Sequence, residues 1–105
     1  MDIGIFSGVA SSGGFSSIVA DAAASAEAGF DTYWLPQIVQ QAEAMNIIGA
    51  AAQTVPNIRF GTSVVPTYPR HPMVMAEQAQ TTSMITGGRF TLGIGLSHKP
   101  VVEGM

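Results

Sequence analysis

The chain has 105 residues, of which four are basic and seven acidic, so its formal net charge is −3. Hydrophobic residues make up 47% of the sequence and charged residues 10%. This composition excludes disorder, which requires low hydrophobicity and high net charge. It also lacks the basic residues that would neutralise phosphates, so we expect no nucleic-acid partner. Because there is no cysteine, disulfides, thiolate metal sites and cysteine nucleophiles are excluded.

The charge content is low for a domain of this size. An ordinary soluble domain carries about 25% charged residues, and a small domain exposes proportionally more surface than a large one. The length still allows one domain with its own core. We therefore expect that another structure covers much of the surface, or that the chain is part of a larger domain.

The sequence predicts no membrane segment. The most apolar stretches, residues 18–28 and 47–55, are short and are interrupted by Asp21, Glu27 and Gln53, whereas a membrane-spanning helix needs about 20 apolar residues. The first residues lack the basic region of a signal peptide. We expect a cytoplasmic protein that makes no membrane contact.

The first half of the chain predicts two strand-then-helix units. A strand at residues 3–6 leads through a Gly/Ser-rich loop at 7–14 to a helix at 16–28, which Ser16 or Ser17 can cap and Gly29 ends. The second strand, at residues 32–35, is β-branched and aromatic and ends at Pro36. A helix follows at residues 41–53, and its apolar spacing predicts a buried face, formed by Met45, Ile48 and Ala52.

The second half predicts a third unit and a fourth strand. The third strand spans residues 58–65, and its helix begins at Pro72, since a helix tolerates proline in its first turn. That helix runs to about residue 85, with Met75, Ala79 and Thr82 at core spacing, before Gly87 and Gly88. The fourth strand spans residues 89–95. We expect no helix in the remaining residues, 97–105, which contain Pro100.

The alternation of strands and helices predicts a parallel sheet with right-handed crossovers. Strands start near residues 3, 32, 58 and 89, so one unit is about 29 residues long. A (β/α)₈ barrel of about 250 residues has a unit of about 31. The predicted fold class is therefore α/β, as the N-terminal half of a (β/α)₈ TIM barrel with four parallel strands and three helices. We expect residues 1–105 to form this single partial domain.

Four sequence motifs follow one another in this register. They are AGFDTYWLPQ at residues 28–37, GTSVVP at 61–66, Arg70-His71-Pro72, and GGRFTLGIG at 87–95. Their order and spacing resemble the bacterial luciferase-like family of flavin- and deazaflavin-dependent oxidoreductases. The resemblance covers nearly the whole chain. The stretch LGIGLSHKPVVEGM, at residues 92–105, is most similar to the branch that uses the deazaflavin coenzyme F420.

The resemblance implies a barrel roughly two to three times as long as this chain. It implies that FMN or coenzyme F420 binds at the C-terminal ends of the strands, and that the full-length parent is an oxidoreductase or monooxygenase acting on a small molecule. The chain departs from the family in length, because it stops just after the fourth strand. We therefore expect an N-terminal fragment that lacks its C-terminal half, or a homo-oligomer.

The candidate site is formed by the loops that follow the strands, because barrel active sites lie at that end. These loops are rich in small polar residues and nearly free of charge, which favours a large planar cofactor over a hydrolase with a paired nucleophile and base. The family places a cis peptide bond at the position of Ser63-Val64. The predicted cofactor-binding residues are Ser7, Thr62, Ser63, Val64, Gly95, Ser97 and His98.

Other motifs receive a structural interpretation. The run from Gly93 begins like a dinucleotide-binding fingerprint, but His98 replaces the third glycine and Pro100 follows where a helix should begin. His71 is expected to cap its helix or lie on the surface, and His98 to face the site. Neither histidine has a carboxylate or cysteine at ligand spacing, so we expect no metal site.

Five further residues complete the prediction. Gln37 ends the second strand where many relatives carry an acidic residue, and we assign it to substrate binding; as a glutamine it cannot act as a general base. Tyr33 and Trp34 face opposite sides of their strand, one toward the barrel interior and the other toward the helices. Arg70 could meet an anionic part of a cofactor, whereas Arg89 lies at the opposite end and is expected to be structural.

A second hypothesis belongs to a different class. The chain would then be a non-catalytic half-barrel module that dimerises to close a barrel, because a four-stranded parallel sheet exposes two edges and one uncovered face. A bound cofactor with flavin-like absorbance would favour the oxidoreductase hypothesis, and a stable dimer without cofactor would favour the module. A small nucleotide-binding α/β protein is disfavoured by the broken fingerprint.

Overall fold

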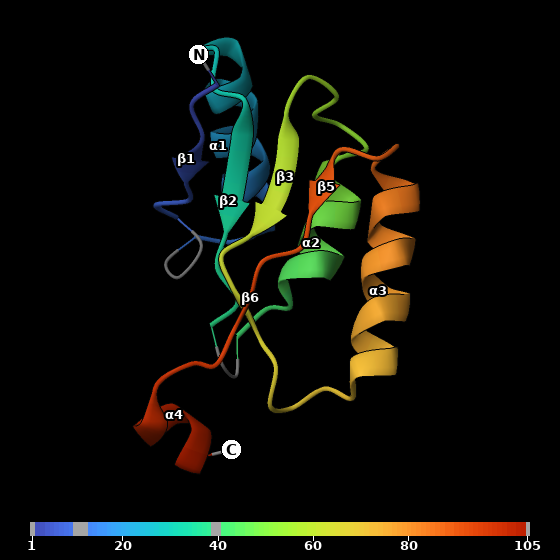
Figure 1. Ribbon diagram of the computed structural model, residues 1–105. Helices are drawn as coiled ribbons and strands as arrows, with labels where there is room; N and C mark the ends of the chain where they lie inside the picture. Colours follow the sequence, from blue (N-terminus) through green and yellow to red (C-terminus); the bar gives the residue numbers. More distant parts are fainter. Residues whose placement is uncertain (1, 10–12, 39–40, 105) are drawn as a thin grey trace.

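The computed structural model describes residues 2–9, 13–38 and 41–104. Its main element is a parallel sheet in which the strands follow one another in the order β1, β2, β3, β5 (Figure 1). A second pair of parallel strands, β4 and β6, prolongs β3 and β5 toward the C-terminal edge. The strands are β1 (Ile5–Phe6), β2 (Thr32–Leu35), β3 (Arg59–Thr62), β4 (Val65–Pro66), β5 (Phe90–Thr91) and β6 (Ile94–Gly95).

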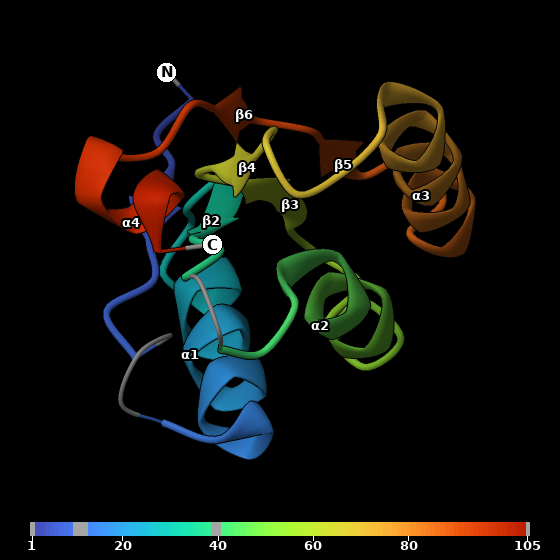
Figure 2. The same cartoon turned by 90° about the horizontal axis from the view of Figure 1, so that it is seen from below.

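Three helices follow the strands, of which the first two lie against one face of the sheet and the third lies beside β5 and packs on the second (Figure 2). They are α1 (Phe15–Glu27), α2 (Ala44–Ala51) and α3 (Pro72–Ile85), and a short fourth helix, α4 (Lys99–Glu103), lies near the C-terminal edge. In the described part of the chain, no helix covers the opposite face, which we call the open face. In a closed barrel the corresponding face of the strands points inward.

The predicted order of strands and helices is confirmed, but two predicted strands are interrupted. The third ends as β3 at Thr62 and resumes as β4 at Val65, and the peptide bond between Ser63 and Val64 is cis. The fourth breaks between β5 and β6 around Gly93. Thr62 Oγ1 explains the second break, because it donates to the Gly93 carbonyl and accepts from the Gly93 amide, both at 2.8 Å.

The predicted start of α1 is right to within one residue, but the predicted serine cap was wrong. The helix begins at Phe15 after the N-cap residue Gly14, without a side-chain cap, so Ser16 and Ser17 lie inside the first turn. The prediction that Gly29 ends this helix is confirmed. Gly29 follows the helix with a φ of 91°, and its amide donates to the Ala26 carbonyl at 3.1 Å. Only glycine adopts this left-handed conformation without steric cost.

The predictions for the other helix termini had mixed outcomes. The helix expected over residues 41–53 is shorter, because the Glu43 side chain accepts from the amides of Met45 and Asn46 and starts α2 at Ala44. The bounds of α3 are confirmed, and His71 caps it by accepting from the Met73 amide at 3.1 Å. The expectation of no helix after the fourth strand was wrong, because Pro100 sits in the first turn of α4, where proline is tolerated.

The core lies between the sheet and the helices. One cross-strand row of Ile5, Tyr33, Phe60 and Phe90 faces α1 and α2, in the register that pairs these residues. Tyr33 and Phe60 are buried, and their rings meet edge to face at a centroid distance of 6.2 Å. The predicted buried face of α2 is confirmed by Met45, Ile48 and Ala52.

Arg89 has the structural role expected of it. Its guanidinium donates to the carbonyls of Ala52, Val55 and Ile58 at 3.1, 3.0 and 2.7 Å, and its Nε donates to Thr86 at 3.0 Å. These carbonyls belong to the C-terminal end of α2 and the turns that follow α2 and α3. The Arg89 side chain therefore satisfies backbone acceptors of three separate segments, of which the Thr86 carbonyl also accepts from the Arg89 backbone amide at 3.4 Å.

Candidate functional site

The cis peptide unit lies at the C-terminal edge, between β3 and β4. Val64 is 39% exposed there, and its Cγ2 lies only 2.6 Å from the position that a Cβ on Gly95 would occupy. The backbone of β4 is held to β6 beside it, since the Val65 amide donates to Gly93 and the Thr67 amide to Gly95. Four predicted site positions, Thr62, Ser63, Val64 and Gly95, therefore form one compact unit.

A hollow of about 460 Å³ opens on the open face and reaches this unit. Gly4, Phe6, Trp34 and Ser63 line it, and we call it the open-face hollow. The Trp34 indole occupies the space that side chains on Gly61 and Gly4 would need, because added Cβ atoms there would lie 2.3 and 2.6 Å from ring atoms. Two glycines thus allow the indole to lie close against the sheet. Trp34 and Tyr33 face opposite sides, as predicted.

Ser7 directly follows β1, and its side chain points into the core. It is 3% exposed, and its Oγ lies 2.6 Å from the Tyr33 hydroxyl. Tyr33 also lies 2.6 Å from Asp21 Oδ2 on α1. Burial, together with the hydrogen bond to Asp21, raises the pKa of Tyr33 well above its usual range. The assignment of Ser7 to cofactor binding stays a prediction, and in the structure the Ser7 hydroxyl is hydrogen-bonded to Tyr33.

The raised pKa of Tyr33 gives a stability prediction at high pH. Above about pH 10, the usual tyrosine value, the unfolded chain loses this proton while the folded chain keeps it. The free energy of unfolding should therefore be intact below about pH 10 and fall as the pH rises further, and Tyr33→Phe should lack this part of the fall. Urea unfolding of both proteins from about pH 8 to about pH 11 measures the difference. Parallel curves would contradict the prediction.

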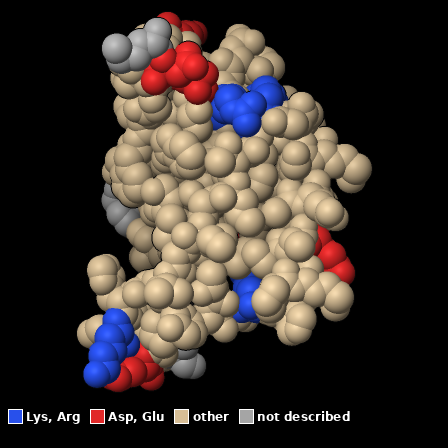
Figure 3. All heavy atoms as spheres, viewed as in Figure 1, with Lys and Arg blue, Asp and Glu red and all other residues tan. Residues whose placement is uncertain are grey.

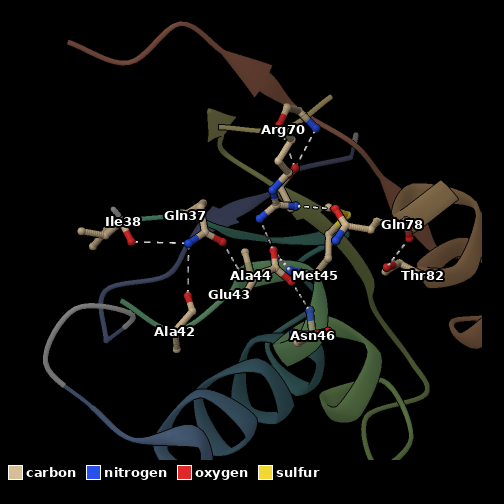
Figure 4. Close-up of polar contacts among 12 residues, drawn as sticks. Gln37, Ile38, Ala42, Glu43, Ala44, Met45, Asn46, Arg70, Gln78 and Thr82 are labelled. Carbon is tan, nitrogen blue, oxygen red and sulfur yellow. Dashed lines mark hydrogen bonds and ion pairs between the residues drawn. The ribbon is translucent and has the colours of Figure 1, made fainter. Parts of the chain in front are cut away.

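A polar cluster joins the loops that follow β2 and β4 (Figure 4). Arg70 donates to Glu43 on one side and to Gln78 of α3 on the other, both at 2.9 Å. Gln37 accepts from the Ala44 amide at 2.6 Å and donates to two carbonyls of its own loop. Arg70 is thus paired with a carboxylate, and Gln37, predicted to bind substrate, makes these bonds within its own loop. The substrate-binding assignment stays a prediction.

Ser97 and His98 lie past the end of β6. Ser97 has a φ of 66°, in the left-handed region that non-glycine residues seldom adopt. His98 is the N-cap residue of α4 but makes no side-chain capping bond. Both residues are exposed, and their predicted contact with a cofactor stays a prediction.

The surface over the sheet carries little charge. Figure 3 shows a broad uncharged area on this face, with charged atoms gathered mainly toward its upper and lower ends. Among the described residues, no group of three or more His, Asp or Glu is placed to hold a metal ion. The arrangement of small residues, a bulged strand end and two aromatic rings can hold a planar, largely uncharged ring system.

Two features of this site were not found from the sequence. Phe6 and Trp34 line the open-face hollow, although neither was among the predicted site residues. Glu43 ties the second loop to Arg70. The alternation of side chains along β1 was a signal for Phe6, whereas no local signal pairs Glu43 with a residue 27 positions away.

The comparison with protein families decides the classification. The model of the family described as luciferase-like monooxygenase matches residues 1–105, the whole chain. The chain belongs to the luciferase-like monooxygenase family. The resemblance recognised in the strand-end motifs is thereby confirmed.

Two relatives in this family show how much of a complete protein the chain represents. A Mycobacterium tuberculosis protein that carries the name of a coenzyme F420-dependent oxidoreductase is 35% identical over 82 residues, 78% of this chain and 23% of its own length. The 4-hydroxyprotoasukamycin monooxygenase of Streptomyces nodosus subsp. asukaensis is 43% identical over 53 residues, 50% of this chain and 14% of its own length. The chain thus spans less than a quarter of these luciferase-like relatives.

Solved structures confirm the fold class. The coenzyme F420-dependent tetrahydromethanopterin reductase of Methanopyrus kandleri superposes with a TM-score of 0.83 at 22% identity, over 99% of this chain and 29% of that one. The oxygenating constituent of 3,6-diketocamphane monooxygenase from Pseudomonas putida, solved with FMN, gives a TM-score of 0.82 at 23% identity, over 99% and 32%. The luciferase-like chain is therefore a partial TIM barrel. None of its described helices is long and apolar enough to cross a membrane.

Proposed function

We propose that the chain is the N-terminal portion of an oxidoreductase or monooxygenase, in which it holds one side of the ring system of FMN or coenzyme F420. When bound, such a cofactor supplies hydride transfer or oxygen activation. The chain's own residues would bind and orient the ring. In this proposal residues 1–105 form one partial barrel domain, completed by a C-terminal half or by a second copy.

The observation that carries the proposal is the unit of Ser63, Val64 and Gly95 beside the open-face hollow. Gly95 leaves the space that Val64 occupies, so the apolar Val64 side chain can face a flat ring. Phe6 and Trp34 line the neighbouring hollow and provide aromatic surface. The relatives that bind F420 or FMN by name support this ligand class.

The described residues also suggest which steps lie elsewhere. Gln37 cannot accept a proton as a base, and the Glu43 carboxylate is paired with Arg70. We infer that this part of the protein binds and orients the cofactor and excludes water from one side of it. Apart from His98, whose imidazole is exposed past the end of β6, groups that move a proton to or from the substrate would then come from other parts of the complete site.

A substitution at Val64 tests the proposal. Val64→Phe, alone and with Ser63→Phe, should weaken FMN and F420 binding by at least about a hundredfold, because a bulky side chain would occupy the space of the ring. The matched control is Val74→Phe on α3, where the valine is 41% exposed, close to the 39% of Val64. Titration followed by cofactor fluorescence measures both affinities. Equal affinities for the two phenylalanine variants would refute this placement of the ring.

The second candidate, a half-barrel module without catalysis, rests on the exposed sheet edge. A hollow of about 320 Å³ opens beside β6, lined in part by Pro72, Met75, Leu92 and Ile94, and Ile94 is 56% exposed. Such an apolar edge could receive another strand unit of a second copy. Native mass spectrometry separates the candidates, because a dimer without cofactor favours the module and retained flavin or deazaflavin favours the oxidoreductase.

A further inference from the structure

Tyr33 is the one described residue whose buried ionisable side chain joins three successive elements of the fold. Its hydroxyl reaches Ser7 at the end of β1 and Asp21 on α1, both at 2.6 Å. A phenol has a single proton to donate, and a carboxylate can only accept. The arrangement that satisfies both bonds has Ser7 donating to the Tyr33 oxygen and Tyr33 donating to Asp21.

This chain of hydrogen bonds fixes a strand that is otherwise weakly held. β1 has two residues and pairs only with β2 among the described strands. Beyond it, the Ser7 amide donates to the Trp34 carbonyl at 2.8 Å, and the Ser7 hydroxyl is bound to Tyr33. Ser7 is therefore held at both its amide and its side chain.

The neighbour of Ser7 is Phe6, which lines the open-face hollow and is 57% exposed. Because successive side chains of a strand point to opposite faces, anchoring Ser7 in the core directs Phe6 toward the hollow. We propose that the Tyr33 hydroxyl is a positioning group which, through Ser7, fixes Phe6 at the ring-binding face. The ligand part of this inference rests on the proposed function.

Hydrogen exchange in the ligand-free 105-residue chain tests the positioning directly. Tyr33→Phe should accelerate exchange of the Ser7 amide. The acceleration should exceed the part caused by lower global stability by a factor of about three to ten. The Phe60 amide, bonded to the Arg89 carbonyl in the sheet, reports the global change. The control is Thr82→Ala, which removes a buried hydroxyl bonded within α3. This substitution should change the exchange rates of the Ser7 and Phe60 amides by the same factor. If the Ser7 and Phe60 amides are accelerated by the same factor in Tyr33→Phe as well, the proposal is overturned.

An FMN titration tests the link to the hollow. Tyr33→Phe should raise the dissociation constant about three- to tenfold, whereas Thr82→Ala should leave it unchanged. In a Phe6→Ala background the effect of Tyr33→Phe should vanish, because no Phe6 ring remains to be positioned. An undiminished effect in that background would overturn the role of Phe6. If the unsubstituted chain binds no FMN, it does not hold the ring without the rest of the barrel, and the exchange data alone decide the positioning role.

Discussion

Replacing Gly93 with alanine should destabilise the protein by about 3 kcal/mol or more. A Cβ at this position would lie 2.1 Å from the Thr62 carbonyl oxygen, a backbone atom that cannot rotate away. The added methyl group would force β4 and β6 apart. It would thereby break the hydrogen bond from the Val65 amide to the Gly93 carbonyl. Urea unfolding followed by Trp34 fluorescence measures the loss.

The matched control for this substitution is Gly8→Ala. A Cβ on Gly8 would meet no atom within 4 Å, and neither glycine has a left-handed φ, so the two variants differ in space rather than in backbone freedom. Gly8→Ala should change stability by less than about 0.5 kcal/mol. If Gly93→Ala lowers the free energy of unfolding as little as Gly8→Ala does, the Thr62 carbonyl does not lie as close to Gly93 as the structure places it.

The second large effect is expected at Arg89. In Arg89→Met, the carbonyls of Ala52, Val55 and Ile58 lose the guanidinium donors that now satisfy them, and the Thr86 carbonyl keeps only the Arg89 backbone amide at 3.4 Å. Hydrogen bonds to a charged group contribute about 1.5 to 3 kcal/mol each, and water replaces part of that loss. We therefore expect a destabilisation of about 3 kcal/mol, measured by the same unfolding experiment.

Arg59→Met provides the comparison for Arg89. Arg59 is exposed, and its two hydrogen bonds are long, at 3.5 Å each. Its replacement should cost less than about 0.5 kcal/mol, and Arg89→Lys should fall between the two, since an ammonium group cannot reach carbonyls in several directions at once. A loss in Arg89→Met no greater than that in Arg59→Met would contradict the assigned role.

The order of strands and helices could be predicted from the sequence because the residues that start and end helices act locally. Gly29 and Gly87 require left-handed backbone and end helices, and His71 followed by Pro72 starts one. The same reasoning was misapplied at Pro100, which was interpreted as a helix breaker although it occupies the first turn, as Pro72 does. Arg89 was correctly assigned to structure from its place at the start of a strand.

The geometry of the candidate site was less accessible, because it depends on pairs of residues that are distant in the sequence. The Thr62 hydroxyl meets Gly93 across 31 positions, and the Trp34 ring lies against Gly61 across 27. Such contacts follow from strand register, which a single sequence specifies only through its hydrophobic pattern. The position of the cis bond at Ser63-Val64 came from the resemblance to the family and is confirmed by the structure.

The polar side chains of the two loops in Figure 4 are bound to nearby backbone atoms and to one another. Gln37 holds its own loop, and Glu43 and Arg70 neutralise each other between α2 and α3. A surface whose polar atoms are already satisfied favours no particular substrate, since recognition of polar groups needs donors and acceptors that are still free. New substrate preferences could therefore evolve in other parts of the barrel while this portion of the scaffold stays unchanged.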